Sequence, residues 1–316
     1  MKLVFIGGCG RSGTTLLGAM LGAHSECLCT PESQFKADVY KDLCAAGGKV
    51  ADIPAALNMI KNHWRFKIWG LALGAEPPRE VTSYPGLLEW IVRMYGAGVG
   101  KPDPGIWIDH TPGNRKHAEM LFDLFPESRM IHIVRDGRAV AASIMPLDWG
   151  ANTIDRAAHF WQTRVSQGLE AESLSKDRVV RVKYEELVQE PEETLKKLCS
   201  FAGIDFRQEM IKGAGYKVPQ YTQKQHSLIG RAPDSKRAAA WETSLTRRQV
   251  EIFESLAGKL LSDLGYPLKY GTGARKITKI ERFTLDLENY CRKKINRYRK
   301  KSRRRKASLT ETNSDG

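Results

Sequence analysis

The hydrophobic pattern at the N-terminus predicts a strand, a glycine turn and a helix in immediate succession. Four apolar residues, Leu3 to Ile6, are typical of a fully buried strand, and Gly7-Gly8 ends it. Thr14 and Thr15 follow the turn and could cap a helix. The apolar residues after them recur at helical spacing: Leu16, Leu17, Met20 and Leu21. Loop N–H groups and the positive end of a helix dipole would then point at one anion, so the pattern predicts a phosphate-binding loop.

The same alternation of strands and helices continues along the chain. Short apolar runs predict four more strands, at Glu26–Thr30, Ile106–Ile108, Met130–Val134 and Val179–Val182. Helical patterns occupy residues 35–98, 114–125, 140–144, 153–174 and 192–202, and a further helix spans 247–264. This order predicts an α/β fold with a parallel, doubly wound sheet of the P-loop NTPase-like type and helices on both faces.

Polar clusters follow the predicted strands. They are Pro31-Glu32-Ser33-Gln34, Asp109-His110-Thr111-Pro112, Arg135-Asp136-Gly137-Arg138 and Lys183-Tyr184-Glu185-Glu186. In open parallel sheets ligands bind outside the carboxyl ends of the strands. We therefore expect these clusters to converge with the glycine loop on one site.

Composition changes the interpretation at one end of the chain only. The 316 residues are 41% hydrophobic, enough for a substantial core, and carry a formal charge of +14. Residues 274–316 account for +10 of that charge, and residues 1–273 for only +4. The basicity therefore belongs to the tail, and the body of the chain does not resemble a nucleic-acid-binding protein.

Cysteine spacing and the N-terminus bear on the compartment. The six cysteines show no paired metal-ligand spacing, so we expect buried free thiols and no metal site. Met1-Lys2 leads directly into the first strand without the apolar segment of a signal peptide, and no run reaches the roughly 18 apolar residues of a membrane span. The expectation is a soluble, cytoplasmic protein.

The glycine loop departs from an NTPase P-loop at one position. Gly8, Gly13 and Thr15 match G-x-x-x-x-G-K-[ST], but Thr14 replaces the lysine and Arg11 supplies a cation from within the loop. An ATP- or GTP-binding loop with a degenerate lysine is one interpretation. The other is that Gly10-Arg-Ser-Gly-Thr-Thr15 resembles the 5′-phosphosulfate loop of sulfotransferases, which bind 3′-phosphoadenosine 5′-phosphosulfate (PAPS) and need no Mg²⁺.

Two later segments resemble the same family. Arg135-Asp-Gly-Arg-Ala-Val-Ala-Ala-Ser143 is similar to the segment in which an arginine and a serine hold the 3′-phosphate, and Val182–Val188 with Pro191 is similar to a segment whose tyrosine lies near the nucleotide. The resemblance spans residues 3 to about 200. With a weaker match at Gln225-His226-Ser227, it implies a metal-free nucleotide site made of Gly10, Arg11, Ser12, Gly13, Thr14, Thr15, Arg135, Ser143, Tyr184 and Ser227.

The first helix and its continuation look most like tyrosylprotein sulfotransferases and their bacterial relatives. That branch has a glutamate base in the segment matching Pro31-Glu32-Ser33, which implies Glu32 as the base. The family's stabilising lysine falls at His110, so the resemblance implies that Arg11 and His110 offset charge on the leaving oxygen. Glu32 could instead cap a turn or pair with an arginine, and His110 could be a core histidine.

The resulting prediction is a sulfotransferase that moves a sulfuryl group from PAPS to an acceptor hydroxyl in line, releasing 3′,5′-bisphosphoadenosine (PAP). The alternatives are an ATP-dependent P-loop kinase and a non-catalytic adaptor that acts through the basic tail. Glycan, lipid, peptide and small-molecule hydroxyls are all compatible acceptors.

The tail is predicted to begin after a boundary at Gly271-Thr272-Gly273, giving a domain over 1–272 and an extension over 273–316. Apolar residues at helical spacing lie among arginines and lysines over residues 276–306, which predicts a basic amphipathic helix. Such a helix could lie on an anionic membrane surface or dock on its own domain. Residues 307–316 are predicted to be disordered.

Overall fold

The fold is taken from a computed structural model, which describes residues 1–45, 52–74, 76–218, 229–230 and 233–311, with backbone alone over 300–311. The described chain divides into two compact units. The first comprises residues 1–134 and 167–234, and the second comprises residues 135–166 and 235–316. The sequence predicts one domain over 1–272, whereas this division groups part of that range with the tail.

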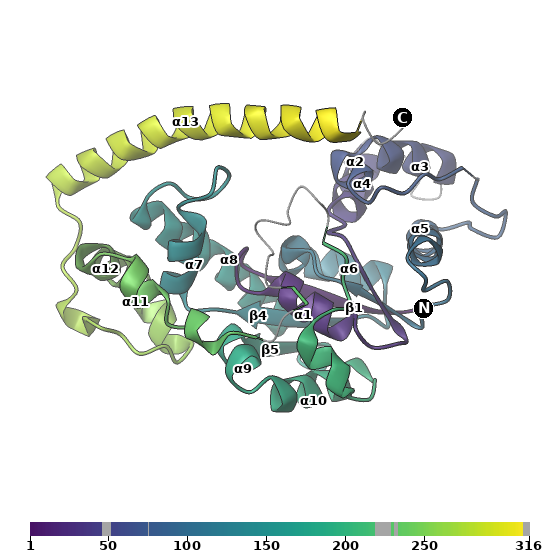
Figure 1. Ribbon diagram of the computed structural model, residues 1–316, viewed down its shortest axis with the longest axis horizontal. Coiled ribbons are helices and arrows are strands. Elements are labelled where there is room, and N and C mark those ends of the chain that lie inside the picture. Colours follow the sequence, from purple (N-terminus) through teal and green to yellow (C-terminus); the bar gives the residue numbers. More distant parts are fainter. Residues whose placement is uncertain (46–51, 75, 219–228, 231–232, 312–316) are drawn as a thin grey trace. The chain divides into compact units, whose positions relative to one another are not determined.

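The first unit contains a five-stranded parallel sheet, as the sequence predicts (Figure 1). Its strands are β1 (Lys2–Gly8), β2 (Cys27–Thr30), β3 (Ile106–Asp109), β4 (Arg129–Val134) and β5 (Val179–Lys183), in the order β2-β3-β1-β4-β5. From β1 the chain passes to β2 at one edge of the sheet, returns to β3 beside β1, and then crosses to β4 and on to β5 at the other edge. The two directions separate at β1, and this topological switch point is where open α/β sheets bind ligands.

The register of the parallel strands places their carboxyl ends together at one end of the sheet. Thr30 of β2 pairs with Asp109 of β3, Gly8 of β1 pairs with Ile133 of β4, and Val134 pairs with Lys183. Because all strands run parallel, the polar residues that follow them emerge on the same side. In the first unit these clusters therefore follow their strands at the end of the sheet where the glycine loop follows β1.

Helices flank the sheet. Those formed wholly by the first unit are α1 (Thr14–Leu21), α2 (Phe35–Ala45), α3 (Ile53–Asn62), α4 (Trp64–Lys67), α5 (Tyr84–Gly98), α6 (Ala118–Leu124), α9 (Tyr184–Gln189) and α10 (Pro191–Ala202), with 3₁₀ turns η1 (Pro112–His117) and η2 (Gln208–Lys212). Strand side chains such as Phe5 and Trp107 pack with α2 to α6 in a continuous apolar core. The α-helix predicted from residue 114 begins four residues later, because Asn114 turns its amide back to the main chain of Ile6 and Asp109 within η1.

The second unit holds α7 (Gly137–Ile144), η4 (Ser235–Arg237), α11 (Trp241–Ser244), α12 (Arg247–Asp263), η5 (Gly271–Gly273) and α13 (Lys279–Glu311), while α8 (Ile154–Leu174) begins in it. Its core is built around Trp161 and Phe253, whose ring centroids lie 5.8 Å apart. A Cβ on Gly137 would lie 2.5 Å from Phe253 and 2.6 Å from Trp161, so only glycine permits this packing. Helix α13 is the long yellow helix of Figure 1, and its backbone is helical over 307–311, where the sequence predicts disorder.

Candidate active site

The loop after β1 has the backbone of an anion cradle. Arg11 has a φ of +73°, the one positive φ of a non-glycine residue among those described, and Gly13 has a φ of +98°. Left-handed residues on both sides of Ser12 turn neighbouring N–H groups of the loop toward one point, and strain of this kind concentrates at functional sites. Ser12 donates its main-chain N–H to Cys9 O at 3.0 Å and thereby closes the loop.

Helix α1 begins without a side-chain cap. The residue at its N-cap is Gly13, which can provide none, and Thr14 and Thr15 lie inside the first turn. The prediction that these threonines cap the helix is therefore wrong, because the chain must enter α1 with a positive φ that threonine resists. The first-turn N–H groups and the positive helix end are left available to an anion.

Side chains around the loop fit a phosphate group. Ser12 is fully buried, and its hydroxyl finds no hydrogen-bond partner among the described residues. A buried hydroxyl left in this state is costly, which is consistent with a ligand oxygen as its partner. Tyr184 covers the loop from the end of β5, since a Cβ on Gly13 would lie 2.6 Å from its ring. The structure thus brings Tyr184 beside the glycine loop, as predicted, and Gly10 and Arg11 are half-buried within that loop.

Glu32 lies just beyond β2 and is held from two sides. Its carboxylate is 3.3 Å from Nη2 of Arg65 in α4, and its main-chain carbonyl accepts a hydrogen bond from Trp69 Nε1, also at 3.3 Å. The side chain is 24% exposed, so solvent or a substrate can reach it. Burial raises the pKa of Glu32 and Arg65 lowers it, with burial dominant. A carboxylate with a raised pKa is better matched to proton abstraction near neutral pH.

His110 follows β3 and is almost completely buried. Its Nδ1 lies 3.5 Å from Sγ of Cys29, and its ring meets the ring of Tyr216 edge-on at 4.8 Å. Burial lowers the pKa of His110 to about 4, against smaller opposing effects of Asp109 and the Thr30 main chain. The imidazole is therefore neutral at pH 7, so it can donate a hydrogen bond but does not supply the cationic charge implied at this position.

The candidate residues of the second unit occupy the end of β4 and the helix after it. Arg135 directly follows Val134, and its Nη2 donates to the carbonyl of Arg237 in η4 at 2.9 Å. Ser143 is half-buried near the end of α7. The neighbouring Arg138 is buried among Asp136, Glu254 and the ring of Trp241, which makes it a structural residue. Ser227 lies outside the described residues.

Sequence reasoning missed two cations near Glu32, Arg65 and Lys36, and the pairing of Lys36 with Asp109. Arg65 sits in the aromatic segment Trp64 to Trp69, and Lys36 and Asp109 form a buried ion pair at 2.6 Å. Lysine beside Phe35 at the start of an apolar helix face was the available signal for a buried cation. Within the described residues, no group of three or more His, Cys, Asp or Glu side chains is placed to hold a metal ion, and no helix is long and apolar enough to cross a bilayer.

Comparison with known proteins gives consistent similarities. The model of the sulfotransferase family matches residues 4–208. A protein-tyrosine sulfotransferase of Drosophila melanogaster is 27% identical over 67% of this chain and 40% of its own length, and protein-tyrosine sulfotransferase A of Caenorhabditis elegans is 27% identical over 66% of this chain and 51% of its own length. The chain thus spans about half or less of these two relatives. A putative protein-tyrosine sulfotransferase of Caenorhabditis briggsae is 24% identical over 84% of this chain and 89% of its own length.

Solved structures share the fold. The sulfotransferase domain of the Synechococcus olefin synthase has a TM-score of 0.60 at 21% identity and covers 85% of this chain and 96% of its own. The sulfotransferase domain from the curacin biosynthetic pathway has a TM-score of 0.57 at 20% identity and covers 84% of this chain and 98% of its own.

Proposed function

Because this chain belongs to the sulfotransferase family, we propose that it is an enzyme that transfers a sulfuryl group from PAPS to an acceptor hydroxyl and releases PAP. The observation that carries the proposal is the uncapped glycine loop, with Gly13 at the N-cap of α1 and the buried Ser12 hydroxyl beside it. This cradle fits the 5′-phosphate of such a nucleotide. The nucleotide supplies the activated sulfuryl group.

Different residues of the chain bind the two ends of the nucleotide. The loop from Gly10 to Thr15 donates main-chain and hydroxyl hydrogen bonds to the 5′ side, with the Arg11 guanidinium adding positive charge. Tyr184 covers the loop and excludes water from one side. Arg135 and Ser143 hold the 3′-phosphate, the arginine through charge-assisted donors and the serine through a neutral one.

Glu32 takes the proton from the acceptor hydroxyl as the new S–O bond forms. Its partial exposure gives access to an acceptor, and burial favours the protonated form that the reaction produces. His110 donates a hydrogen bond as a neutral imidazole, so positive charge near the leaving oxygen falls to Arg11 alone among the three candidate catalytic residues.

An ATP-dependent kinase is the competing function within the same fold. It is disfavoured because Thr14 occupies the position from which a P-loop lysine reaches the β- and γ-phosphates. The experiment is transfer of ³⁵S from labelled PAPS to a panel of phenols, tyrosine peptides, sugars and alcohols. Tyrosine is the first acceptor to test, because the relatives' names point to it. Transfer of ³²P from labelled ATP to the same panel, with no transfer of ³⁵S, would assign the kinase instead.

We also propose that α13 places the enzyme on an anionic membrane surface. Six apolar side chains of this helix are at least half exposed: Ile280 (77%), Phe283 (70%), Leu287 (53%), Tyr290 (56%), Ile295 (50%) and Tyr298 (77%). At 100° per residue they share one face of the helix. Residues 276–306 carry a net charge of +11, so the occupant that fits is an anionic lipid surface.

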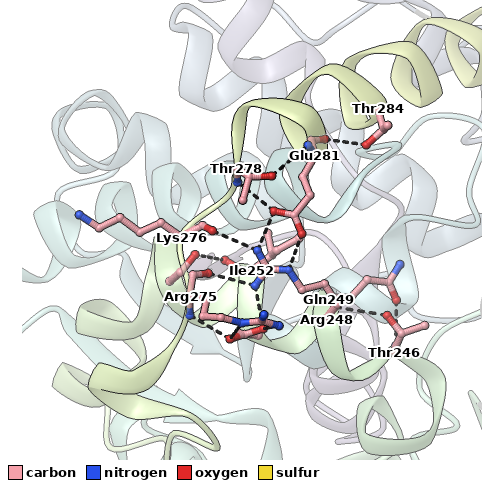
Figure 2. Close-up of polar contacts among 11 residues, drawn as sticks. Thr246, Arg248, Gln249, Ile252, Arg275, Lys276, Thr278, Glu281 and Thr284 are labelled. Atoms are coloured by element: carbon pink, nitrogen blue, oxygen red, sulfur yellow. Dashed lines mark hydrogen bonds and ion pairs between the residues drawn. The ribbon is translucent and has the colours of Figure 1, made fainter.

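The opposite face of α13 is tied to its own unit by polar contacts. Asn152 donates to Asn289 at 3.0 Å and accepts from Asn296 at 2.8 Å, and Arg156 pairs with Asp286 at 2.9 Å. Figure 2 shows the base of the helix, where Arg248 of α12 makes two hydrogen bonds with Glu281, at 2.7 and 2.8 Å. The docking predicted as an alternative therefore uses the polar face and leaves the apolar face uncovered within the described residues.

Sedimentation with liposomes tests this surface. Phe283→Ser combined with Leu287→Ser should lower binding to phosphatidylserine vesicles severalfold, and high salt should lower it too. Leu174→Ser, which removes an equally exposed apolar side chain from α8, is the control. Location is part of the proposal: we place the chain in the cytoplasm, where the membrane leaflet is anionic. Equal sedimentation of wild type and both variants would contradict the proposal that α13 binds the membrane surface.

A further inference from the structure

A buried polar cluster joins the carboxyl ends of β2 and β3. It consists of the Lys36–Asp109 ion pair, Ser33, Thr111 and Asn114, and every side chain in it is at most 2% exposed. Lys36 belongs to α2, Ser33 follows β2, and the other three follow or end β3. None of these residues belongs to the nucleotide site proposed above.

Hydrogen bonds within the cluster link the two strand ends to each other. The main-chain N–H of Ser33 donates to Thr111 Oγ1 at 2.8 Å, and the Ser33 hydroxyl donates to Asp109 Oδ2 at 2.5 Å. The Thr111 hydroxyl in turn donates to the other oxygen of Asp109 at 2.6 Å. The peptide that joins Glu32 to Ser33 is thus bonded directly to the segment that carries His110.

Lys36 and Asn114 complete the connections. The Lys36 ammonium contacts Asp109 at 2.6 Å, Asn114 Oδ1 at 2.6 Å and Ser33 Oγ at 3.1 Å, which satisfies all three of its N–H groups. Burial raises the pKa of Asp109, but Lys36 and the hydroxyls outweigh it and lower the pKa to about 2. The carboxylate is therefore ionised and can hold all of these donors throughout the neutral range.

Stability alone gives a weak reason for such a cluster. Removing two charges from water is costly, and apolar residues of similar volume are often as stabilising as a buried ion pair. What apolar residues cannot provide is a fixed direction for the main chain around them. Here that main chain carries Glu32 immediately before Ser33 and His110 immediately after Asp109.

We infer that the Lys36–Asp109 cluster is a positioning element that holds Glu32 and His110 in register at neighbouring strand ends for sulfuryl transfer. The inference rests on the proposed function, in which these two residues meet the acceptor and the leaving group. A side chain displaced by about 1 Å from its reacting partner can lose on the order of a hundredfold in rate. A rigid main chain at both residues avoids this loss.

Thr111 offers the sharpest test, because Lys36→Met would leave the Asp109 carboxylate buried and unpaired and could prevent folding. Thr111→Val keeps the shape of the side chain but removes the acceptor of the Ser33 N–H and the donor to Asp109. Thr111→Ser keeps the hydroxyl and is the rescue variant. Ser128→Ala is the control for stability, since Ser128 is equally buried and its hydroxyl donates to Phe125 O at 2.6 Å, at the other end of the sheet.

The primary readout is the titration of the Glu32 carboxyl by ¹³C NMR, with Glu32→Gln used for assignment. In Thr111→Val we expect the pKa of Glu32 to move toward its ordinary value near 4.3 and kcat to fall about tenfold or more, with PAP affinity within about twofold of wild type. Thr111→Ser should restore both. Ser128→Ala should lower the thermal midpoint without changing either.

A Thr111→Val enzyme that loses thermal stability while keeping the wild-type Glu32 titration would make the cluster purely structural and overturn the inference. The proposed function fails separately, through absence of PAP binding by the wild-type protein. In that event the NMR titration still decides whether the cluster positions Glu32.

Discussion

Replacing Glu32 with glutamine separates a catalytic carboxylate from a structural one. The amide has the same shape but cannot accept a proton, so general-base catalysis worth roughly 10²–10⁴-fold should disappear from kcat. The hydrogen bond from Trp69 Nε1 is to the main chain of residue 32 and survives the change. PAP affinity should remain near the wild-type value, because Glu32 is not among the proposed nucleotide-binding residues.

The effect on stability has a predictable sign. The folded-state pKa of Glu32 is raised, mainly by burial, so between the unfolded-state pKa near 4.3 and this raised value the folded chain binds more protons than the unfolded chain. Stability contributed by this group therefore falls as pH rises through that window and stays lower above it. A neutral glutamine removes the penalty, so the thermal midpoint of Glu32→Gln at pH 7.5 should equal or exceed that of wild type. The gain should vanish below about pH 4, where the wild-type carboxyl is protonated too.

Turnover, PAP affinity and thermal midpoint measured together between pH 4 and 8 give the test. Glu26→Gln is the matched control, because Glu26 is an exposed carboxylate at the opposite end of β2. The interpretation of Glu32 as a partner of Arg65 makes the reverse prediction of lower stability and little change in rate. Wild-type turnover in Glu32→Gln would refute the assignment of the base.

Three further outcomes follow from the same geometry. Calorimetry should show that Arg135→Ala weakens PAP binding roughly tenfold to a hundredfold, since a charge-assisted pair contributes on the order of 1.5–3 kcal/mol, and that Ser143→Ala weakens it less. Unchanged PAP affinity in Arg135→Ala would contradict the assignment of Arg135 to the 3′-phosphate. The folded-state pKa of His110, about 4, lies below its ordinary value of 6.5, so the folded protein loses stability as pH falls from 6.5 to 4. Thermal melts of His110→Gln should show a smaller loss of stability over that range, and a loss identical to that of wild type would contradict the buried neutral imidazole. Arg248→Ala should speed proteolysis between residues 274 and 279 by removing both hydrogen bonds to Glu281, and an unchanged cleavage rate would show that the base of α13 is held by other contacts.

The sheet could be predicted because each strand is a continuous apolar run followed by polar residues. The runs at Leu3–Ile6, Met130–Val134 and Val179–Val182 all lie within observed parallel strands. The glycine loop could also be predicted from the sequence, because its shape depends on the main chain and on glycines within the loop itself. Its helix cap was predicted wrongly because the sequence does not show that Gly13 must have a positive φ.

The parts that escaped prediction depend on contacts between distant segments. Lys36 and Asp109 are 73 positions apart, and their pairing becomes visible only when α2 packs over the ends of β2 and β3. The neutral state of His110 follows from burial against Cys29 and Tyr216, which no local pattern reveals. The face of α13 that docks is set by Asn152 and Arg156, more than a hundred residues earlier in the chain.

Titration of the wild-type protein with PAP and with ATP, each in the presence of EDTA and of Mg²⁺, tests the central claim most directly. A sulfotransferase built on this glycine loop should bind PAP without any divalent ion and with the same affinity when Mg²⁺ is added, because Arg11, Ser12 and the start of α1 are the groups proposed to bind the phosphate. ATP should bind at least tenfold more weakly, since it lacks the 3′-phosphate that Arg135 and Ser143 are proposed to hold. Tight, Mg²⁺-dependent binding of ATP with no measurable binding of PAP would contradict the account.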